Sequence, residues 1–188
     1  MTTEEFLEFM NNGNYCEGGS EAHMCMSRLS QEAIKITTEI NTKYHEPEEI
    51  KALFEKLIGK RIEGGFGLFP PFTTDCGKNI TLGKGVFINS GCRFQDQGGL
   101  VIGDGALIGH NVVIATLNHD LKPQKRQSLI PSPVKIGNNV WIGAGSTILL
   151  GVTIGDNSVI GAGSIVTKDI PENVVAVGSP ARVVKSIQ

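Results

Sequence analysis

The sequence predicts a mainly β protein, a parallel β-helix in which short strands stack coil upon coil. An aliphatic residue recurs at every sixth position within residues 134–169, and these six anchors are Ile136, Ile142, Ile148, Ile154, Ile160 and Val166. Four of the six are followed directly by Gly. A period of six matches neither the 3.6-residue period of a helix nor the two-residue period of a flat strand. Such a fixed short repeat is typical of a solenoid, and the 24 glycines of the chain suit its tight corners.

The same phase continues upstream and divides the anchors into three columns. With three hexads per coil, the columns contain Leu82, Ile102, Ile136 and Ile154; Ile88, Ile108, Ile142 and Ile160; and Phe94, Ile114, Ile148 and Val166. Coils stacked about 4.8 Å apart turn each column into an aliphatic ladder inside a triangular prism. The sequence therefore predicts about four coils.

Residues 1–60 are predicted to form three helices that cap one end of the prism. Thr2 and Glu5 make a capping box for a short first helix. Apolar residues at spacings of three and four follow Ser20 and predict a longer second helix, while Pro47 and Gly59 mark the start and the end of a third. This segment has too little apolar surface to fold alone, so we expect it to close the first coil.

The β-helix is predicted to occupy residues 61–170, with one long insertion at residues 115–133. Because the columns stay in phase across the insertion, it must leave and re-enter the prism at the same corner. A loop of this length on a rigid scaffold is typical of a functional site. Residues 171–188 contain no hexad, and we expect this tail to pack back on the prism.

Composition argues against several classes of function. A formal charge of -2 and a pI near 6.1 give no general attraction to nucleic acid. No apolar run approaches the roughly 20 residues of a membrane span, and the N-terminus lacks a signal-peptide pattern. The four cysteines lack CxxC spacing, which favours reduced thiols and a cytoplasmic protein.

His119, in the insertion, is the leading candidate for a catalytic base. An imidazole is the side chain best suited to removing a proton at neutral pH, although most exposed histidines have no such role and a solvated loop histidine is the alternative. His110 lies in an ordinary hexad corner, and His23 and His45 lie in the helical part. The repeat region has only two histidines, nine residues apart, so no metal site is expected.

Several other side chains have a binding role and a structural role as competing interpretations. Trp141 precedes an inward anchor and therefore points outward, where a partner subunit would bury it. Three polar residues near the coils suit a turn or surface role as well as a binding role: Asn89, Asp75 and Asp96. Three residues near the C-terminus are ordinary surface groups or contacts to a phosphate-bearing ligand: Thr167, Lys168 and Arg182.

The ordered motifs resemble those of the hexapeptide-repeat acyltransferases, and among these the galactoside and maltose O-acetyltransferases. The resemblance covers nearly the whole chain, from CEG (Cys16–Gly18) and PPF (Pro70–Phe72) through NHD, which contains His119, to the repeats and the C-terminal GSPARVV. It implies a left-handed β-helix, an exception to the right-handed crossover rule. It also implies acetyl-CoA as cosubstrate and a homotrimer with active sites between subunits.

The resemblance further implies roles for individual residues. The loop histidine of the family is the general base, which matches His119. The acceptor-binding positions match Asn89, Asp75 and Asp96. The positions near coenzyme A match Ala144, Ala162, Thr167, Lys168, Arg182, Lys185 and Trp141.

Three departures from the family pattern concern the acceptor side. Asp120 follows His119 where the sugar enzymes usually have Pro, Asn14 stands where an Asp is common, and Gln97 replaces a second acid. We therefore expect an acetyl-CoA-dependent O-acetyltransferase that acts by direct attack of a hydroxyl of a sugar or similar small molecule. The alternatives are an acetyltransferase for an antibiotic or amino sugar, a β-helix carbonic anhydrase with bound zinc, and a non-catalytic β-helix binding protein.

Overall fold

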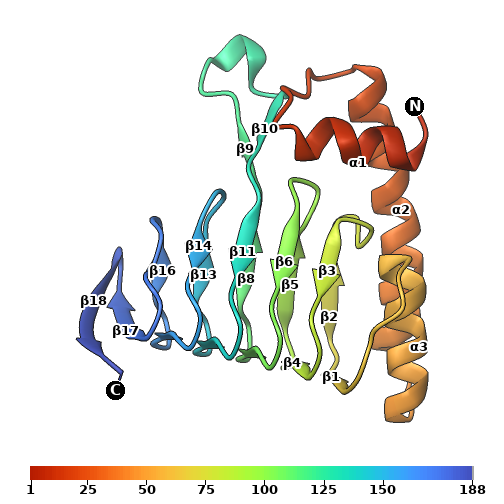
Figure 1. Cartoon of the computed structure of the whole chain (residues 1–188). Coiled ribbons are helices and arrows are strands. Elements are labelled where there is room, and N and C mark those ends of the chain that lie inside the picture. Colours follow the sequence, from red (N-terminus) through yellow and green to blue (C-terminus); the bar gives the residue numbers. More distant parts are fainter. Residues whose placement is uncertain (188) are drawn as a thin grey trace.

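The computed structural model describes residues 1–187 as a β-solenoid with three helices at its N-terminal end (Figure 1). The coils stack along one axis, from β1 and β2 beside the helices to β17 and β18 at the far end (Figure 1). A hairpin of β9 and β10 rises out of this stack and reaches the level of α1 (Figure 1). The fold class predicted from the hexad, a mainly β solenoid of stacked parallel coils, is confirmed.

Three sheets form the faces of the prism, because successive strands along the chain belong to successive sheets. The first face contains β1 (Phe66–Leu68), β4 (Val86–Ile88), β7 (Leu107–Ile108), β12 (Trp141–Ile142), β15 (Val159–Ile160), β17 (Val174–Gly178) and β18 (Ala181–Ser186). The second face contains β2 (Phe72–Thr74), β5 (Cys92–Gln95), β8 (Val113–Ala115), β13 (Thr147–Ile148) and β16 (Ile165–Val166). The third face contains β3 (Ile80–Leu82), β6 (Leu100–Ile102), β11 (Val134–Ile136) and β14 (Thr153–Ile154). We call the edges between them the 1–2, 2–3 and 3–1 corners.

The strand register confirms the three predicted columns. Each anchor is the direct partner of the anchor in the next coil, as Ile136 is of both Ile102 and Ile154. The pairing continues in the same way through all three columns. Except for Leu82, which is half-buried, every anchor is buried. Removing an aliphatic side chain of this size from water stabilises a fold by about 1.5–3 kcal/mol, so these ladders are the main source of the stability of the prism.

The stack begins earlier than the predicted first coil. Leu68 in β1 is the register partner of Ile88, and Thr74 in β2 is the partner of Phe94. The hexad pattern does not reveal this layer, because Thr74 is polar, whereas every other anchor of its column is apolar. Its hydroxyl donates a hydrogen bond of 2.6 Å to Asp96, which explains how a polar residue occupies an interior position.

The three predicted helices are present as α1 (Thr3–Asn11), α2 (Glu21–Thr42) and α3 (Pro47–Ile58). Thr2 forms its capping box with Glu5, and Gly59 ends α3 in the left-handed region at φ 70°. The helices close the end of the prism, since Asn41 of α2 exchanges two hydrogen bonds with the backbone of Phe72 in β2, at 2.8 and 2.9 Å. None of the helices within residues 1–187 combines the length and apolar character required to cross a membrane.

The C-terminal segment adds a last layer to the first face. Ile170 forms a parallel bridge with Ile154, β17 pairs parallel to β15, and β18 folds back antiparallel on β17. The side chain of Val177 lies against Gly161, where a Cβ would approach it to 2.6 Å. The segment therefore covers the end of the stack.

Candidate active site

The insertion at residues 115–133 folds as an antiparallel hairpin. It contains β9 (Leu117–His119), a short 3-10 turn (Pro123–Lys125) and β10 (Leu129–Pro131). Leu117 is the register partner of Pro131, and the Ser132 amide donates to the Thr116 carbonyl at 2.9 Å. The two ends of the hairpin therefore meet at the 2–3 corner, where β8 ends and the chain turns toward β11.

The hairpin holds the His119 ring in one defined orientation. The Nδ1 atom of His119 lies 2.7 Å from the carbonyl oxygen of Arg126. Because a carbonyl oxygen only accepts hydrogen bonds, Nδ1 carries the proton, and in the neutral imidazole Nε2 is then the acceptor. Arg126 is fixed in turn, because its guanidinium donates to the carbonyl oxygens of Asp120 at 3.0 Å and Leu121 at 2.8 Å.

Residues 15–18, near the N-terminus, bind the same hairpin, and we call this set of contacts the clip. Cys16 and Leu129 exchange two backbone hydrogen bonds of 2.9 and 2.8 Å, and the Gly18 amide donates to the Ser128 hydroxyl at 3.0 Å. The Tyr15 hydroxyl donates to the Asp120 carboxylate at 2.8 Å. The Lys122 amide and the Tyr15 hydroxyl lower the pKa of Asp120, so this carboxylate belongs to the clip and not to His119.

A shallow groove of about 240 Å³ runs along the second face beside the base of β9. Its lining includes Thr73, Asp75, Arg93, Gln95, Val113 and Ala115. The Gln95 side-chain oxygen accepts a hydrogen bond of 3.2 Å from the Leu117 amide, which ties the groove to the strand that carries His119. Burial of the carboxylate, and then the charge of Asp96, raise the pKa of Asp75, while a hydrogen bond from the Gln97 side chain opposes the rise.

Asp96 is not where an acceptor-binding carboxylate should be. Its exposed fraction is 0%, and its oxygens accept hydrogen bonds from the Thr74 hydroxyl at 2.6 Å, the Cys76 amide at 2.8 Å and the Asn79 amide at 3.3 Å. Burial raises the pKa of Asp96, and these donors oppose the rise. The expectation that Asp96 contacts the acceptor is therefore wrong for this structure, because the carboxylate is buried and its oxygens already accept hydrogen bonds inside the first coil.

The remaining predicted residues divide between two corners and the first face. Asn89, Ala144 and Ala162 follow first-face strands at the 1–2 corner, where the Gly163 amide donates to the Ala144 carbonyl at 2.8 Å. Arg182 belongs to this corner too, because it pairs with Val177, whose side chain lies against Gly161. Thr167 and Lys168 are exposed at the 2–3 corner, from which the hairpin also leaves. Lys185 pairs with Val175 on β17, and Trp141 lies on the first face.

These corners lie on opposite sides of the second face. Six fully extended residues span at most about 20 Å, so the two corners of one coil lie at most about that distance apart. The structure thus brings Asp75, the hairpin, Thr167 and Lys168 to one corner, and places Asn89, Ala144, Ala162 and Arg182 at the other.

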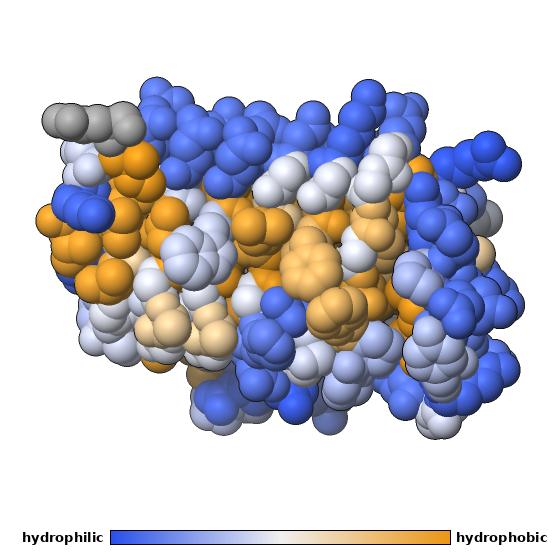
Figure 2. All heavy atoms as spheres, turned by 90° about the horizontal axis from the view of Figure 1, so that it is seen from below, coloured by the Kyte–Doolittle hydropathy of each residue, from blue (hydrophilic) through white to orange (hydrophobic). Residues whose placement is uncertain are grey.

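The first face carries an apolar stripe along the prism (Figure 2). Trp141 is 54% exposed and Leu107, its direct register partner, is 49% exposed. Phe87 precedes Leu107 in the same row, and Val159 and Val175 follow Trp141. The prediction that Trp141 points out of the prism is confirmed.

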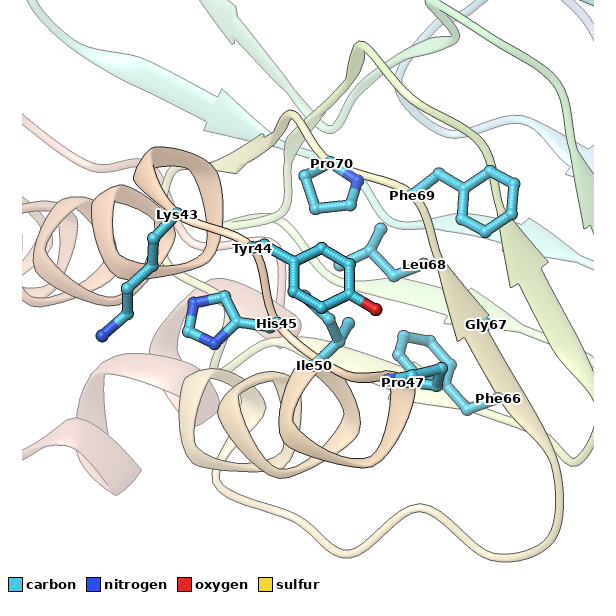
Figure 3. Close-up of a pocket in the computed structure, with 10 residues that line it drawn as sticks. All are labelled: Lys43, Tyr44, His45, Pro47, Ile50, Phe66, Gly67, Leu68, Phe69 and Pro70. Atoms are coloured by element: carbon cyan, nitrogen blue, oxygen red, sulfur yellow. The ribbon is translucent and has the colours of Figure 1, made fainter.

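A mainly apolar pocket lies elsewhere, where the α2–α3 connection meets β1 (Figure 3). It has a volume of about 430 Å³ and is lined by side chains that include Tyr44, Ile50, Phe66, Leu68 and Phe69 (Figure 3). None of the predicted site residues lines it. The pocket lies far from the hairpin in the fold (Figure 1), so it is not part of the candidate site around His119.

Comparison with known proteins agrees with this architecture. Residues 133–168 match the family model described as the hexapeptide repeat of succinyl-transferase. The galactoside O-acetyltransferase of Lactococcus lactis is 41% identical over 161 residues, which cover 84% of this chain and 77% of the relative. The chain belongs to the hexapeptide-repeat acyltransferase family.

Solved structures of the hexapeptide-repeat family superpose on nearly the whole chain. A maltose O-acetyltransferase from Clostridium difficile has a TM-score of 0.88 and 39% identity, with 97% of each chain covered. A hexapeptide-repeat acetyltransferase from Vibrio cholerae, solved with acetyl coenzyme A, has a TM-score of 0.84 and 33% identity over 100% of both chains. The match spans 58% of a relative from Schizosaccharomyces pombe and 63% of nodulation protein L of Rhizobium meliloti, less than two thirds of either.

Of the three departures from the pattern of this family, one follows β9 in the hairpin, one lies in the N-terminal segment that contacts the hairpin, and one lies in the first coil. Asp120 is held by Tyr15, and the Asn14 side chain donates to the Phe9 carbonyl at 3.0 Å. Gln97 is 3% exposed, and its side-chain oxygen has no hydrogen-bond partner among the described residues.

Sequence reasoning overlooked four residues that shape this region: Tyr15, Arg93, Gln95 and Arg126. For Arg93 and Gln95 a signal existed, because they flank the second-face anchor Phe94 just as Thr73 and Asp75 flank Thr74. Tyr15 and Arg126 act through contacts that no periodicity encodes.

Proposed function

We propose that this protein is an acetyl-CoA-dependent O-acetyltransferase that acetylates a hydroxyl of a sugar or similar small molecule. The observation that carries the proposal is the His119 ring, held at Nδ1 by the Arg126 carbonyl at 2.7 Å on an exposed hairpin. This contact leaves Nε2 as the acceptor, which is the arrangement a general base requires.

In the proposed reaction His119 moves one proton twice. Nε2 accepts the proton of the acceptor hydroxyl as the hydroxyl oxygen forms a bond to the thioester carbonyl carbon. When the carbon–sulfur bond breaks, Nε2 returns that proton to the departing thiolate, so an ester and a free thiol are formed and the imidazole is neutral again. An amide N–H near Ala144 faces the oxyanion, a kind of contact usually worth about 3 kcal/mol.

The acceptor side is proposed to consist of Asp75 and Asn89. Asp75 lies in the groove beside β9, where its carboxylate can accept a hydrogen bond from an acceptor hydroxyl. Asn89 lies at the 1–2 corner and can both donate and accept. The mixed polar lining of the groove, with Arg93 and Gln95, suits a ligand rich in hydroxyl groups.

Acetyl-CoA is proposed to bind along the backbone of the 1–2 corner and to exposed Lys and Arg side chains. The 1–2 corner is built from small residues, and a Cβ added at Gly145 or Gly163 would meet no atom within 4 Å. An extended chain carrying amides can therefore approach the backbone closely at Ala144 and Ala162. Lys168 and Arg182, both exposed, supply positive charge for phosphate groups, together with Lys185 on β18 and the Thr167 hydroxyl beside Lys168. The structure of a galactoside acetyltransferase with coenzyme A, 35% identical with a TM-score of 0.83, supports this assignment by analogy.

We further propose that the working form is a cytoplasmic homotrimer. The residues assigned to the acceptor and to acetyl-CoA lie at two corners of one prism, and a neighbouring copy can bring its 1–2 corner to the 2–3 corner of the first. The apolar stripe around Trp141 and Leu107 supplies a surface that such an association would bury (Figure 2).

A screen of acceptors with acetyl-CoA tests the proposed function. The panel contains a nitrophenyl galactoside, maltose, glucosamine and a simple primary alcohol, and free thiol release is followed together with the mass of the product. We expect one hydroxyl acceptor to gain 42 mass units, about the mass of an acetyl group less one hydrogen, in step with thiol release. Acetylation confined to the amine of glucosamine would contradict O-transfer, and absence of acetyl-CoA binding by calorimetry would contradict acetyl transfer altogether.

A further inference from the structure

We propose that Asp96 is a positioning residue, which holds the turn of residues 74–79 so that Asp75 faces the acceptor groove. That the groove binds the acceptor rests on the proposed function. That Asp96 positions Asp75 rests on the hydrogen bonds of Asp96. Asp96 is not assigned contact with any substrate.

The hydrogen bonds of Asp96 enclose Asp75 on both sides. The donors belong to Thr74, Cys76 and Asn79, at 2.6, 2.8 and 3.3 Å. The amide of Asp75 itself donates to the Phe94 carbonyl at 3.1 Å, two residues before Asp96. The backbone on either side of Asp75 is thus anchored to the end of β5, and its side chain is left to line the groove.

A carboxylate is a costly choice for this position. Asp96 is fully buried, and within residues 1–187 no Lys or Arg forms an ion pair with it. Burying a carboxylate without a cation is unfavourable unless hydrogen bonds compensate for the lost water. All the partners of Asp96 are donors, which suits the ionised form, and buried groups of this kind cluster at functional sites.

Asp96 also acts on Asp75 through its charge. The charge of Asp96 is the second cause, after burial, of the raised pKa of Asp75. The other charged or titratable groups around the pair are Arg93 in the groove, the Cys76 thiol, whose pKa burial raises to about 12, and Lys60. Lys60 donates to the Ile80 carbonyl at 2.9 Å and to the Thr81 hydroxyl at 3.0 Å, so its head group is occupied by the third face.

The first arm of the test is a double-mutant cycle in the full-length protein. With whichever acceptor of the panel turns over, Asp96→Asn should raise the acceptor KM about tenfold, the loss expected for one charge-assisted contact, and leave the KM for acetyl-CoA unchanged. In an Asp75→Asn background the same substitution should have no further effect on the acceptor KM. An effect that persists undiminished in that background, or that raises both KM values equally, would mean that Asp96 only stabilises the fold.

Two further variants keep the test decisive. Thr74→Val removes one donor and leaves the acid, so it should shift the acceptor KM in the same direction by a smaller factor even if Asp96→Asn does not fold. Asp156→Asn is the matched control, because Asp156 accepts the Asn138 amide at 2.8 Å at the 3–1 corner, across the prism from the second face. An equal acceptor effect in Asp156→Asn would overturn the proposal.

The second arm needs no turnover. Carbon-detected NMR follows the titration of the Asp75 carboxyl in the wild type and in Asp96→Asn, or in Thr74→Val if the former does not fold. Loss of the buried charge should move the Asp75 midpoint to lower pH, and in Thr74→Val a change in the Asp75 carboxyl shift at fixed pH should report the loosened turn. An unchanged Asp75 signal overturns the inference, whereas a shifted signal in a protein that acetylates nothing sustains the inference and refutes the proposed function.

Discussion

Tyr15 and Asp120 lie 105 residues apart in the chain and are joined by a hydrogen bond of 2.8 Å from the phenol hydroxyl to the carboxylate. This contact fastens the segment before α2 to the hairpin, one residue beyond His119. The clip also includes the two backbone hydrogen bonds between Cys16 and Leu129. The N-terminal segment therefore helps to hold the proposed base, in addition to the helices closing the prism.

Removal of that hydroxyl should loosen the hairpin. Tyr15→Phe is expected to lower kcat/KM a few-fold and to speed amide hydrogen exchange in residues 117–131, because one fixed contact of the clip is lost. Tyr44→Phe is the matched control, since Tyr44 is 80% exposed and its pocket holds none of the proposed site residues. Equal exchange rates in Tyr15→Phe and wild type would show that the backbone pairing alone holds the hairpin.

Loss of the imidazole should reduce the chemical step. His119→Ala is expected to lower kcat by roughly 10² to 10⁴, the usual contribution of a positioned general base, while calorimetry finds coenzyme A binding unchanged. The acid limb of the kcat/KM profile should disappear in the variant. The fold should survive, because His119 lies outside the three columns.

A comparison with His110→Ala sharpens that experiment. His110 is exposed at the 1–2 corner, where its carbonyl accepts the Gly145 amide at 2.7 Å. If His119→Ala keeps more than about a tenth of the wild-type activity, outside the range for a general base, and His110→Ala does not, the base is His110.

The two cations should affect the cosubstrate more than the acceptor. Lys168→Ala and Arg182→Ala are each expected to raise the KM for acetyl-CoA by about tenfold or more, the loss of a charge-assisted hydrogen bond. The effect should shrink at high salt because exposed charges are screened. Lys135→Ala, on the exposed side of the third face, is the control. Unchanged coenzyme A affinity in the double variant would remove both residues from that site.

The apolar stripe should control assembly. Trp141→Glu with Leu107→Glu places two charges on the first face and is expected to convert a trimer into monomers in light scattering, with loss of activity. Val101→Glu is the control, because Val101 is 43% exposed on the third face. A wild-type protein of monomer mass at micromolar concentration would contradict a site shared between subunits.

Ionised Asp75 should lower the free energy of unfolding at neutral pH. Its pKa is raised in the folded chain, so the folded state holds the proton more tightly than the unfolded state. Stability therefore falls as the pH rises from the ordinary Asp pKa through the raised one. Asp75→Asn should have a higher Tm than wild type at pH 7, and the difference should shrink as the pH is lowered through this window. A variant that is no more stable at pH 7 would show that ionised Asp75 is compensated.

The columns could be predicted because interior positions of a solenoid repeat with the coil. Each anchor from Leu82 to Val166 carries its own signal, and the register of Ile136 with Ile102 and Ile154 follows from phase alone. The layer of β1 and β2 was missed because Thr74 satisfies its hydroxyl with Asp96 instead of being apolar. Thr74 and Asp96 are polar residues that are buried together and hydrogen-bonded to each other, so Thr74 interrupts the hydrophobic periodicity of the column.

The site could be predicted only in part. The hexad placed the insertion and Thr167 after strands of the same column, so their common corner was implicit in the sequence. Asp75 joins this corner only through β2, the strand that the hexad did not reveal. Asp96 was misassigned because a carboxylate after an anchor is usually solvated, and only the three-dimensional turn shows three donors converging on it. The partner of His119 was out of reach for a similar reason, since Arg126 contributes its backbone carbonyl, which every residue type possesses.

The hairpin enters and leaves the prism through one corner, with Leu117 opposite Pro131 and the columns in phase on both sides. Lengthening, shortening or exchanging the residues between these two positions changes no strand pairing in the stack. The proposed base can therefore be varied without altering the strand pairing of the prism. A lineage can inherit the prism unaltered while its hairpin diverges toward new acceptors. A chimaera that receives a foreign hairpin between Thr116 and Ser132 should retain the melting behaviour of its host if the hairpin keeps Leu117 and Leu129, which are buried in one cluster with Phe6 and Met10.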